Sequence, residues 1–267
     1  MKSKIREIYS LEQLSGRDTS IHQLHPLIKL ITSLGFIIIV VSFGRYSLIP
    51  MIPMVFYPTI VMALSETPYG LLLKRCALAL PFCLLAGISN LILDTGAAFT
   101  LGSLSISLGF FSFLTLLFKA YLSVITVLLL VATTPISDIA GAMKRLKIPD
   151  LFITLFEMTY RYIGILMEEA SSMALAYRLR SHEQKGIVLN HMGSFVGQLL
   201  IRSFDRAERI YQAMKLRGYP ASQKGFAEKK ASARDILYLI IVLGSSLIFR
   251  FLNIPGTMNN FIERFIP

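Results

Sequence analysis

Two short segments in the polar part of the chain nearly repeat each other. Residues 176–181 read Ala-Tyr-Arg-Leu-Arg-Ser and residues 213–218 read Ala-Met-Lys-Leu-Arg-Gly, each at the end of a segment with helical spacing. A helix that ends there carries a guanidinium group beside a small residue. The planar guanidinium pairs bidentately with carboxylates, and the small residue lets another backbone approach. The candidate contact residues are Ala176, Leu179, Arg180 and Ser181 in the first segment and Ala213, Met214, Leu216, Arg217 and Gly218 in the second.

One such segment alone is explained by the preference of helix C-termini for basic residues, through the helix dipole and last-turn capping. The pair, placed after a long apolar half of the chain, instead predicts two points of contact with another protein. We expect the guanidinium groups of Arg180 and Arg217 to lie outside the lipid and not far from each other.

The rest of the sequence offers little catalytic chemistry. It has no glycine-rich loop followed by Lys and Ser or Thr, so it predicts no nucleotide site. His22 and His25 are spaced i, i+3, but no further His, Cys or carboxylate is close in sequence, and we interpret them as interfacial or capping residues. Cys76 and Cys83 lie in one apolar stretch and receive no chemical role. We therefore predict no catalytic residue, no metal ligand and no bound cofactor.

The composition is that of a membrane protein. The 267 residues are 54% hydrophobic and 16% charged, and the mean hydropathy is +0.61, which is more apolar surface than a soluble domain hides. The net charge of +11 follows from basic residues gathering on the cytoplasmic side of membrane proteins. We therefore predict the lipid bilayer, and no nucleic acid, as a partner.

Five segments approach the length of about 20 apolar residues that crosses the hydrocarbon layer. The N-terminal arm and the Lys74-Arg75 loop are basic, whereas residues 94–106 contain no Lys or Arg. The positive-inside rule then predicts a multi-pass plasma-membrane protein with its N-terminus and its polar segment in the cytoplasm and its C-terminal tail outside. The predicted crossings are residues 27–44, 47–64, 76–93, 108–133 and 236–252.

The polar segment is predicted to form two long cytoplasmic helices. Pro149 is suited to the start of the first helix, which continues to Arg180, and the second runs from about His191 to Leu216, before Gly218. We predict an all-α fold with three parts: residues 1–134 with the N-terminal arm and four membrane helices, residues 135–234 with the two long helices, and residues 235–267 with the last membrane helix and the tail.

Lys119 lies near the middle of the apolar stretch 108–133. A charge inside a membrane is costly to bury alone and marks a candidate functional site. Two interpretations stay open: Lys119 faces a cavity or a membrane partner, or the helix tilts and the lysine extends to an interface.

On these residues the chain resembles the transmembrane T component of energy-coupling-factor transporters, most closely the cobalt-type CbiQ family. The likeness covers most of the chain, and its most specific stretch is residues 203–219, which resembles the family's second coupling helix. Other segments follow in the family's order and approximate spacing: residues 21–30, 146–149, 160–162, 168–169 and 176–181.

The resemblance implies a non-catalytic scaffold that joins a substrate-binding S component in the membrane, similar to CbiM, to two ABC-type ATPase subunits in the cytoplasm. ATP and Mg²⁺ are then bound by the ATPases. The implied substrate is Co²⁺, with Ni²⁺ next, although the S component selects it.

In this family two coupling helices each end in Ala-Arg-Gly or Ala-Arg-Ser, whose Arg enters an ATPase groove, and the resemblance places Arg180 and Arg217 in that role. Leu179 and Leu216 replace the usual Ala, so the close backbone fit is in question while the Arg contact is retained. His25 stands where the family usually has an acidic residue, so any salt bridge made by that acid is in question.

Two other classes of function compete with the scaffold. An integral-membrane enzyme acting on phosphate-bearing lipid would need clustered acidic residues, yet Asp138, Asp150 and Asp205 are far apart in sequence. A stand-alone channel or secondary carrier would place Lys119 in its pathway and would transport without ATP or partners.

Overall fold

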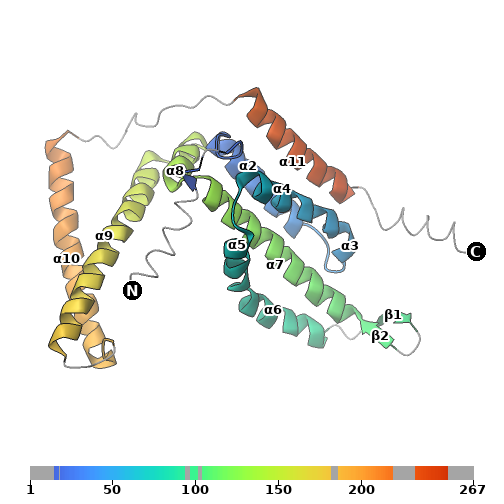
Figure 1. Ribbon diagram of the computed structural model, residues 1–267, viewed down its shortest axis with the longest axis horizontal. Helices are drawn as coiled ribbons and strands as arrows, with labels where there is room; N and C mark the ends of the chain where they lie inside the picture. The colour runs from blue at the N-terminus through green and yellow to red at the C-terminus, as the bar shows by residue number, and fades with distance from the viewer. Residues whose placement is uncertain are drawn as a thin grey trace, which may run out of the picture. The chain divides into compact units, whose positions relative to one another are not determined.

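The computed structural model shows an all-α membrane protein built from two compact units (Figure 1). One unit comprises residues 11–139 and 229–267 and is called the bundle here. The other comprises residues 1–10 and 140–228 and is called the coupling unit. The structure describes residues 15–17, 19–93, 97–101, 104–181, 186–218 and 232–251.

The bundle contains most of the apolar helices. The helix α2 begins at Pro26, a residue suited to a first turn because its missing N–H is not needed there, and the His25 side chain accepts a hydrogen bond from the Leu27 amide at 3.2 Å. This confirms the capping interpretation of His25. The elements of the bundle are α2 (Pro26–Val41), α3 (Leu48–Met51), η1 (Ile52–Val55), α4 (Phe56–Ser65), α5 (Tyr69–Ala77), α6 (Leu80–Leu93), α7 (Leu108–Thr133) and α11 (Ala233–Phe251).

Two helical stretches of the described chain are long and apolar enough to cross a membrane, namely Leu48–Ser65 and Gly109–Thr133. A third is the bent pair of Tyr69–Ala77 and Leu80–Ser89, whose two parts meet at 45°. By length and composition, the described helices therefore support two or three of the five predicted crossings.

The two remaining predicted crossings form shorter or more polar helices. The helix α2 is apolar but has only 16 residues. The helix α11 has 19 residues, and every window of 18 within it contains Arg234, Asp235 and Arg250. These charges sit near the two helix ends, where membrane proteins accommodate them at an interface.

A short antiparallel hairpin interrupts the predicted loop 94–106. Its strands β1 (Ala97–Leu101) and β2 (Leu104–Ser107) pair Thr100 with Ser105 and Leu101 with Leu104. The hairpin connects α6 to α7, and these two helices pack against each other. Their contact is close at Gly87, where an added Cβ would lie 2.5 Å from the Phe113 ring.

The core of the bundle forms where α2 packs against both α7 and α11. Phe36 and Val40 of α2 are fully buried in a cluster with Met51 and Leu122, and the Phe36 ring lies 4.5 Å from the ring of Tyr57. Burial of this apolar surface against neighbouring helices holds α2 between α7 and α11.

The coupling unit contains the two long predicted helices. The helix α9 (Asp150–Arg180) has 31 residues and α10 (Leu189–Leu216) has 28. The predicted start after Pro149 and the predicted end at Arg180 are confirmed, and the second helix begins two residues before its predicted start. A shorter helix, α8 (Ile136–Arg145), precedes them, and Lys144 forms an ion pair with Asp150 at 3.2 Å.

Candidate functional site

The helices α9 and α10 run in opposite directions and meet where the chain turns from one to the other (Figure 1). A hydrogen bond of 2.8 Å joins the Tyr177 hydroxyl and Nδ1 of His191. Their rings meet edge to face, with centroids 5.8 Å apart. The last turns of α9 are thereby fixed to the first turn of α10.

A second connection joins the middles of the two helices. The Glu169 carboxylate on α9 accepts hydrogen bonds from Arg202 at 2.6 Å and from Arg206 at 3.3 Å, one oxygen for each arginine. Arg202 and Arg206 are one helical turn apart on α10 and therefore lie on the same face. One carboxylate thus holds two successive turns of the facing helix through charge-assisted bonds.

The two predicted contact segments lie at the exposed ends of these helices. Arg180 is the last residue of α9, and Arg217 is the C-cap residue of α10; both are exposed. Beside them, Leu179 is 78% exposed and Leu216 is 89% exposed. A large apolar residue next to an exposed Arg combines the features of a protein contact, because both groups are free to be buried by a partner.

The other predicted members of the segments are also accessible. Ala176, Ala213 and Gly218 are exposed, and Met214 and Ser181 are partly buried. The hydroxyl of Ser181 is shielded from solvent and has no hydrogen-bond partner among the described residues.

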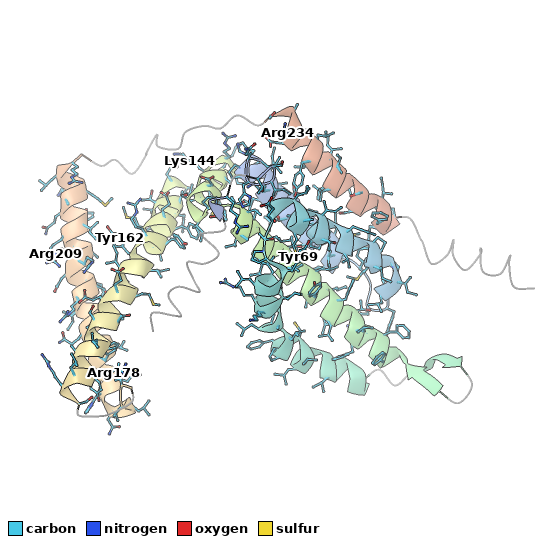
Figure 2. All side chains as sticks on the ribbon, in the orientation of Figure 1. Tyr69, Lys144, Tyr162, Arg178, Arg209 and Arg234 are labelled. Carbon is cyan, nitrogen blue, oxygen red and sulfur yellow. The ribbon has the colours of Figure 1, made fainter. Side chains whose placement is uncertain are left out.

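The expectation that Arg180 and Arg217 lie close together is wrong. Tyr177 near the end of α9 contacts His191 near the start of α10, so the second helix runs antiparallel to the first and its C-terminus lies at the far end of the pair. At 1.5 Å per residue, the course of α10 from His191 to its end places the two arginines roughly 30–40 Å apart. In Figure 2, Arg178 and Arg209 mark the two regions of the pair.

The two helix ends differ in their backbone. Gly218 has φ +64°, in the left-handed region, and its amide donates to the Lys215 carbonyl at 3.1 Å, while the Arg217 amide donates to Ala213 at 3.2 Å. Ser181 has φ −97°, which any residue adopts. Only the second end therefore requires glycine for its conformation.

An apolar groove of about 700 Å³ opens between the first half of α9 and the second half of α10. Tyr162 lines it from α9 (Figure 2). Apolar side chains dominate the groove, with Arg206 and Lys215 on its α10 side. Its lining residues are Leu151, Thr154, Leu155, Met158, Thr159, Tyr162, Leu166, Ser203, Arg206, Ala207, Ile210, Tyr211, Met214 and Lys215.

Lys119 in the bundle serves as a helix cap. Its ammonium group donates to the Val41 carbonyl at 3.2 Å and also to the Phe43 carbonyl, at the C-terminal end of α2. Arg250 of α11 reaches the same place, donating to Ser42 at 3.0 Å and lying 4.7 Å above the Phe43 ring. Two cations therefore hold the last carbonyls of α2, which suits the negative end of a helix.

Sequence reasoning missed two buried charged residues at the opposite end of α2. Lys29 is 4% exposed and donates to the Thr133 carbonyl at 2.8 Å and to the His22 carbonyl at 3.3 Å. Asp235 is 6% exposed and accepts from the His25 amide at 3.1 Å. Their long-range partners, Thr133 and His25, lie 104 and 210 residues away, and no local pattern indicates those two contacts.

His22 and His25 make local hydrogen bonds. His22 Nδ1 lies 2.7 Å from the Thr19 hydroxyl, and His25 caps α2. Among the residues that the structure describes, no group of three or more His, Cys, Asp or Glu side chains is placed to hold a metal ion.

Comparison with known proteins gives one family match and several relatives. A family model described as cobalt transport protein, CbiQ, matches residues 17–225. The cobalt transport protein CbiQ of Rhodobacter capsulatus is 29% identical over 120 residues, covering 45% of this chain and 49% of that protein, so the alignment spans about half of the relative. The energy-coupling factor transporter transmembrane protein EcfT of Bacillus subtilis is 26% identical over 86% of this chain and 93% of that protein.

A third relative is named as a fusion protein. It is the putative fused cobalt transport protein CbiMQ of Methanocorpusculum labreanum, which is 28% identical over 45% of this chain and 20% of its own length.

Proposed function

The chain belongs to the CbiQ family of cobalt transport proteins, and on that premise we propose that it is the transmembrane coupling subunit of an energy-coupling-factor importer. The main support for this proposal is the pair of exposed helix ends. Each end presents an Arg beside an exposed Leu, and the two helices are joined by hydrogen bonds and ion pairs. The subunit itself has no catalytic role, and ATP with Mg²⁺ is bound by its partners.

Each helix end takes one ATPase. The separation of roughly 30–40 Å between Arg180 and Arg217, set by the helix rise, is too large for one groove and suits two subunits side by side. A guanidinium group enters a carboxylate-lined groove on each ATPase, and the neighbouring Leu is buried at the rim.

ATP binding then acts through differential affinity. ATPases that approach each other on binding ATP favour the helix arrangement that fits their closed form. Because Glu169 and the Tyr177–His191 contact connect α9 to α10 at two places, a displacement of one helix is transmitted to the other. Motion of packed helices of this kind is a common form of conformational coupling.

The apolar groove between α9 and α10 is proposed to receive the membrane S component. A groove of about 700 Å³ with mainly apolar walls suits a helix or loop of a membrane protein. The name of the fused relative pairs a CbiM part with a CbiQ part, which supports a CbiM-like partner. Co²⁺ is the proposed substrate, with Ni²⁺ next, and Lys119 is proposed as a second contact with the S component.

The proposed orientation places the N-terminus and the coupling unit in the cytoplasm of a multi-pass plasma-membrane protein. Two contacts support the directions of the helices that this requires: α2 and α11 run parallel, since Asp235 meets His25 and Arg250 meets Ser42.

The test is reconstitution. The chain is co-expressed with the ATPases and the CbiM-like protein from one genome, purified through a tag on this chain, and placed in liposomes with ATP on the ATPase side. We expect both partners to co-purify and Co²⁺ to be taken up only with ATP and all subunits, with Ni²⁺ measured in parallel. Uptake by this chain alone, without ATP, would establish the carrier alternative instead.

A further inference from the structure

Between α7 and α11 the chain leaves the bundle once and returns to it once. It leaves after Thr133, the last residue of α7, and passes through Thr134 and Pro135 into α8, within which the coupling unit begins at Ala140. The bundle resumes at residue 229, and Ser232 immediately precedes α11. A force that travels along this stretch of chain from α9 and α10 to the bundle must pass these two connections.

The outgoing connection is fixed by Lys29. Its ammonium group donates to the final carbonyl of α7 at 2.8 Å while remaining 4% exposed. The carbonyls at a helix C-terminus lack intrahelical partners, and a charged donor binds them more strongly than a neutral one. The end of α7 is thereby held against the first turn of α2.

The returning connection is fixed by Asp235. One carboxylate oxygen accepts from the Ser232 amide at 2.7 Å, which closes the first turn of α11. The other accepts from the His25 amide at 3.1 Å, immediately before α2. The start of α11 is therefore held at the same turn of α2 as the end of α7.

We propose that Lys29 and Asp235 are positioning residues for energy coupling, because they fix both connections of the α8–α10 segment to one point of the bundle, the start of α2. This inference rests on the proposed coupling function. Movement of α9 and α10 then shifts α7 and α11 together about α2. We call these two side chains the anchor. When one of them is replaced, the connection that it holds can move relative to α2, and ATP hydrolysis then produces less movement of the bundle.

The opposite end of α2 provides a matched control. There Arg250 of α11 also donates to a backbone carbonyl of the α2 terminus. It joins the same two helices as Asp235 but lies away from both connections. Substitutions at either end of α2 can lower the stability of the bundle. If the anchor serves coupling, only substitutions at the anchor end should also lower the uptake per ATP hydrolysed.

The experiment compares Lys29→Met and Asp235→Asn with Arg250→Met in the complete reconstituted complex. The readout is the number of Co²⁺ ions taken up per ATP hydrolysed, together with ATPase rate and subunit content. In the two anchor variants we expect this ratio to fall by about fivefold or more, the lower range of common coupling energies, with the ATPases still bound and active. In Arg250→Met we expect the wild-type ratio.

Asp235→Asn preserves side-chain volume, so it tests the anchor even if Lys29→Met fails to assemble. A wild-type ratio in Asp235→Asn, or an equal fall in Arg250→Met, would overturn the inference. A wild-type complex without ATP-driven uptake would instead contradict the proposed function, so the two failures are distinguishable.

Discussion

Lys29 of α2 and Lys119 of α7 each donate to a carbonyl at the C-terminal end of the other's helix. Lys29 binds the carbonyl of Thr133, the last residue of α7, and Lys119 binds that of Val41, the last residue of α2. The exchange is possible because the two helices are antiparallel. Unpaired carbonyls are costly in lipid, so both lysines have a structural reason to lie among apolar helices.

This relationship weakens the carrier alternative, which needs Lys119 to line a pathway. If Lys119 also contacts the S component, as proposed, Lys119→Met should reduce co-purification of that partner while the ATPases remain bound. If capping is its whole role, the same variant should lower the free energy of unfolding by about 1–3 kcal/mol and leave the subunit content unchanged. Quantitative mass spectrometry of the purified complex separates the two results.

Arg180→Ala and Arg217→Ala should each lower ATP-driven uptake by about tenfold or more, because interface arginines are often dominant contacts. The double variant should release the ATPases during purification, since both contacts are lost. Membrane insertion should be normal in all three. Lysine at either position should restore little, because an ammonium lacks the planar fork. Full uptake in the double variant would contradict the assignment.

Gly218→Ala should damage the second contact, whereas Ser181→Ala should not damage the first. The reason is the backbone: Gly218 has φ +64° and Ser181 has φ −97°, and a left-handed conformation costs an L-residue about 1–2 kcal/mol. Binding of the ATPases should weaken several-fold only for the glycine variant. Equal affinities in the two variants would show that the conformation of the cap does not matter.

Spin labels at the exposed positions Leu179 and Leu216 should report a separation of roughly 30–40 Å, as the helix rise requires for antiparallel helices. In the complete complex this distance should change on addition of a non-hydrolysable ATP analogue. A distance under about 20 Å would mean that the helices are not extended side by side. Labels at Tyr162 and Arg178, both on α9, give a fixed reference.

Gly87→Ala should destabilise the bundle, whereas Gly244→Ala should have little effect. A Cβ at Gly87 would lie 2.5 Å from the Phe113 ring, while one at Gly244 meets no atom within 4 Å. Overpacking typically costs about 1–3 kcal/mol. Thermal unfolding in detergent measures the difference, and the further change Phe113→Leu should restore much of the lost stability.

Local signals predicted the elements of the coupling unit well. Pro149 marked the start of α9, and Gly218 marked the end of α10, because the conformational limits of proline and glycine act within one turn. The hairpin after α6 was missed although its pattern was present: residues 99–107 alternate apolar with Ser or Thr around Gly102, which is typical of paired strands.

The arrangement of the site was harder to predict. The sequence predicted the lengths of the two helices and of their short connection, and an antiparallel pair follows from those lengths. The similarity of the segments around Arg180 and Arg217 nevertheless suggested that the two arginines lie close together. The roles of Lys29 and Asp235 depend on backbone groups far along the chain. Such pairs become visible only once the helices are placed, because a capping lysine needs no particular sequence around it.

Glu169 marks the crossing of α9 and α10. Arg180 lies eleven residues after Glu169, and Arg217 lies fifteen residues after Arg202 and eleven after Arg206, so the two ends lie about 16–22 Å from the ion-paired crossing. A rotation of about 10° about this crossing would displace an end that lies 16–22 Å away by roughly 3–4 Å. Such a rotation would also have to move Tyr177 away from His191, so that hydrogen bond resists a change in the crossing angle.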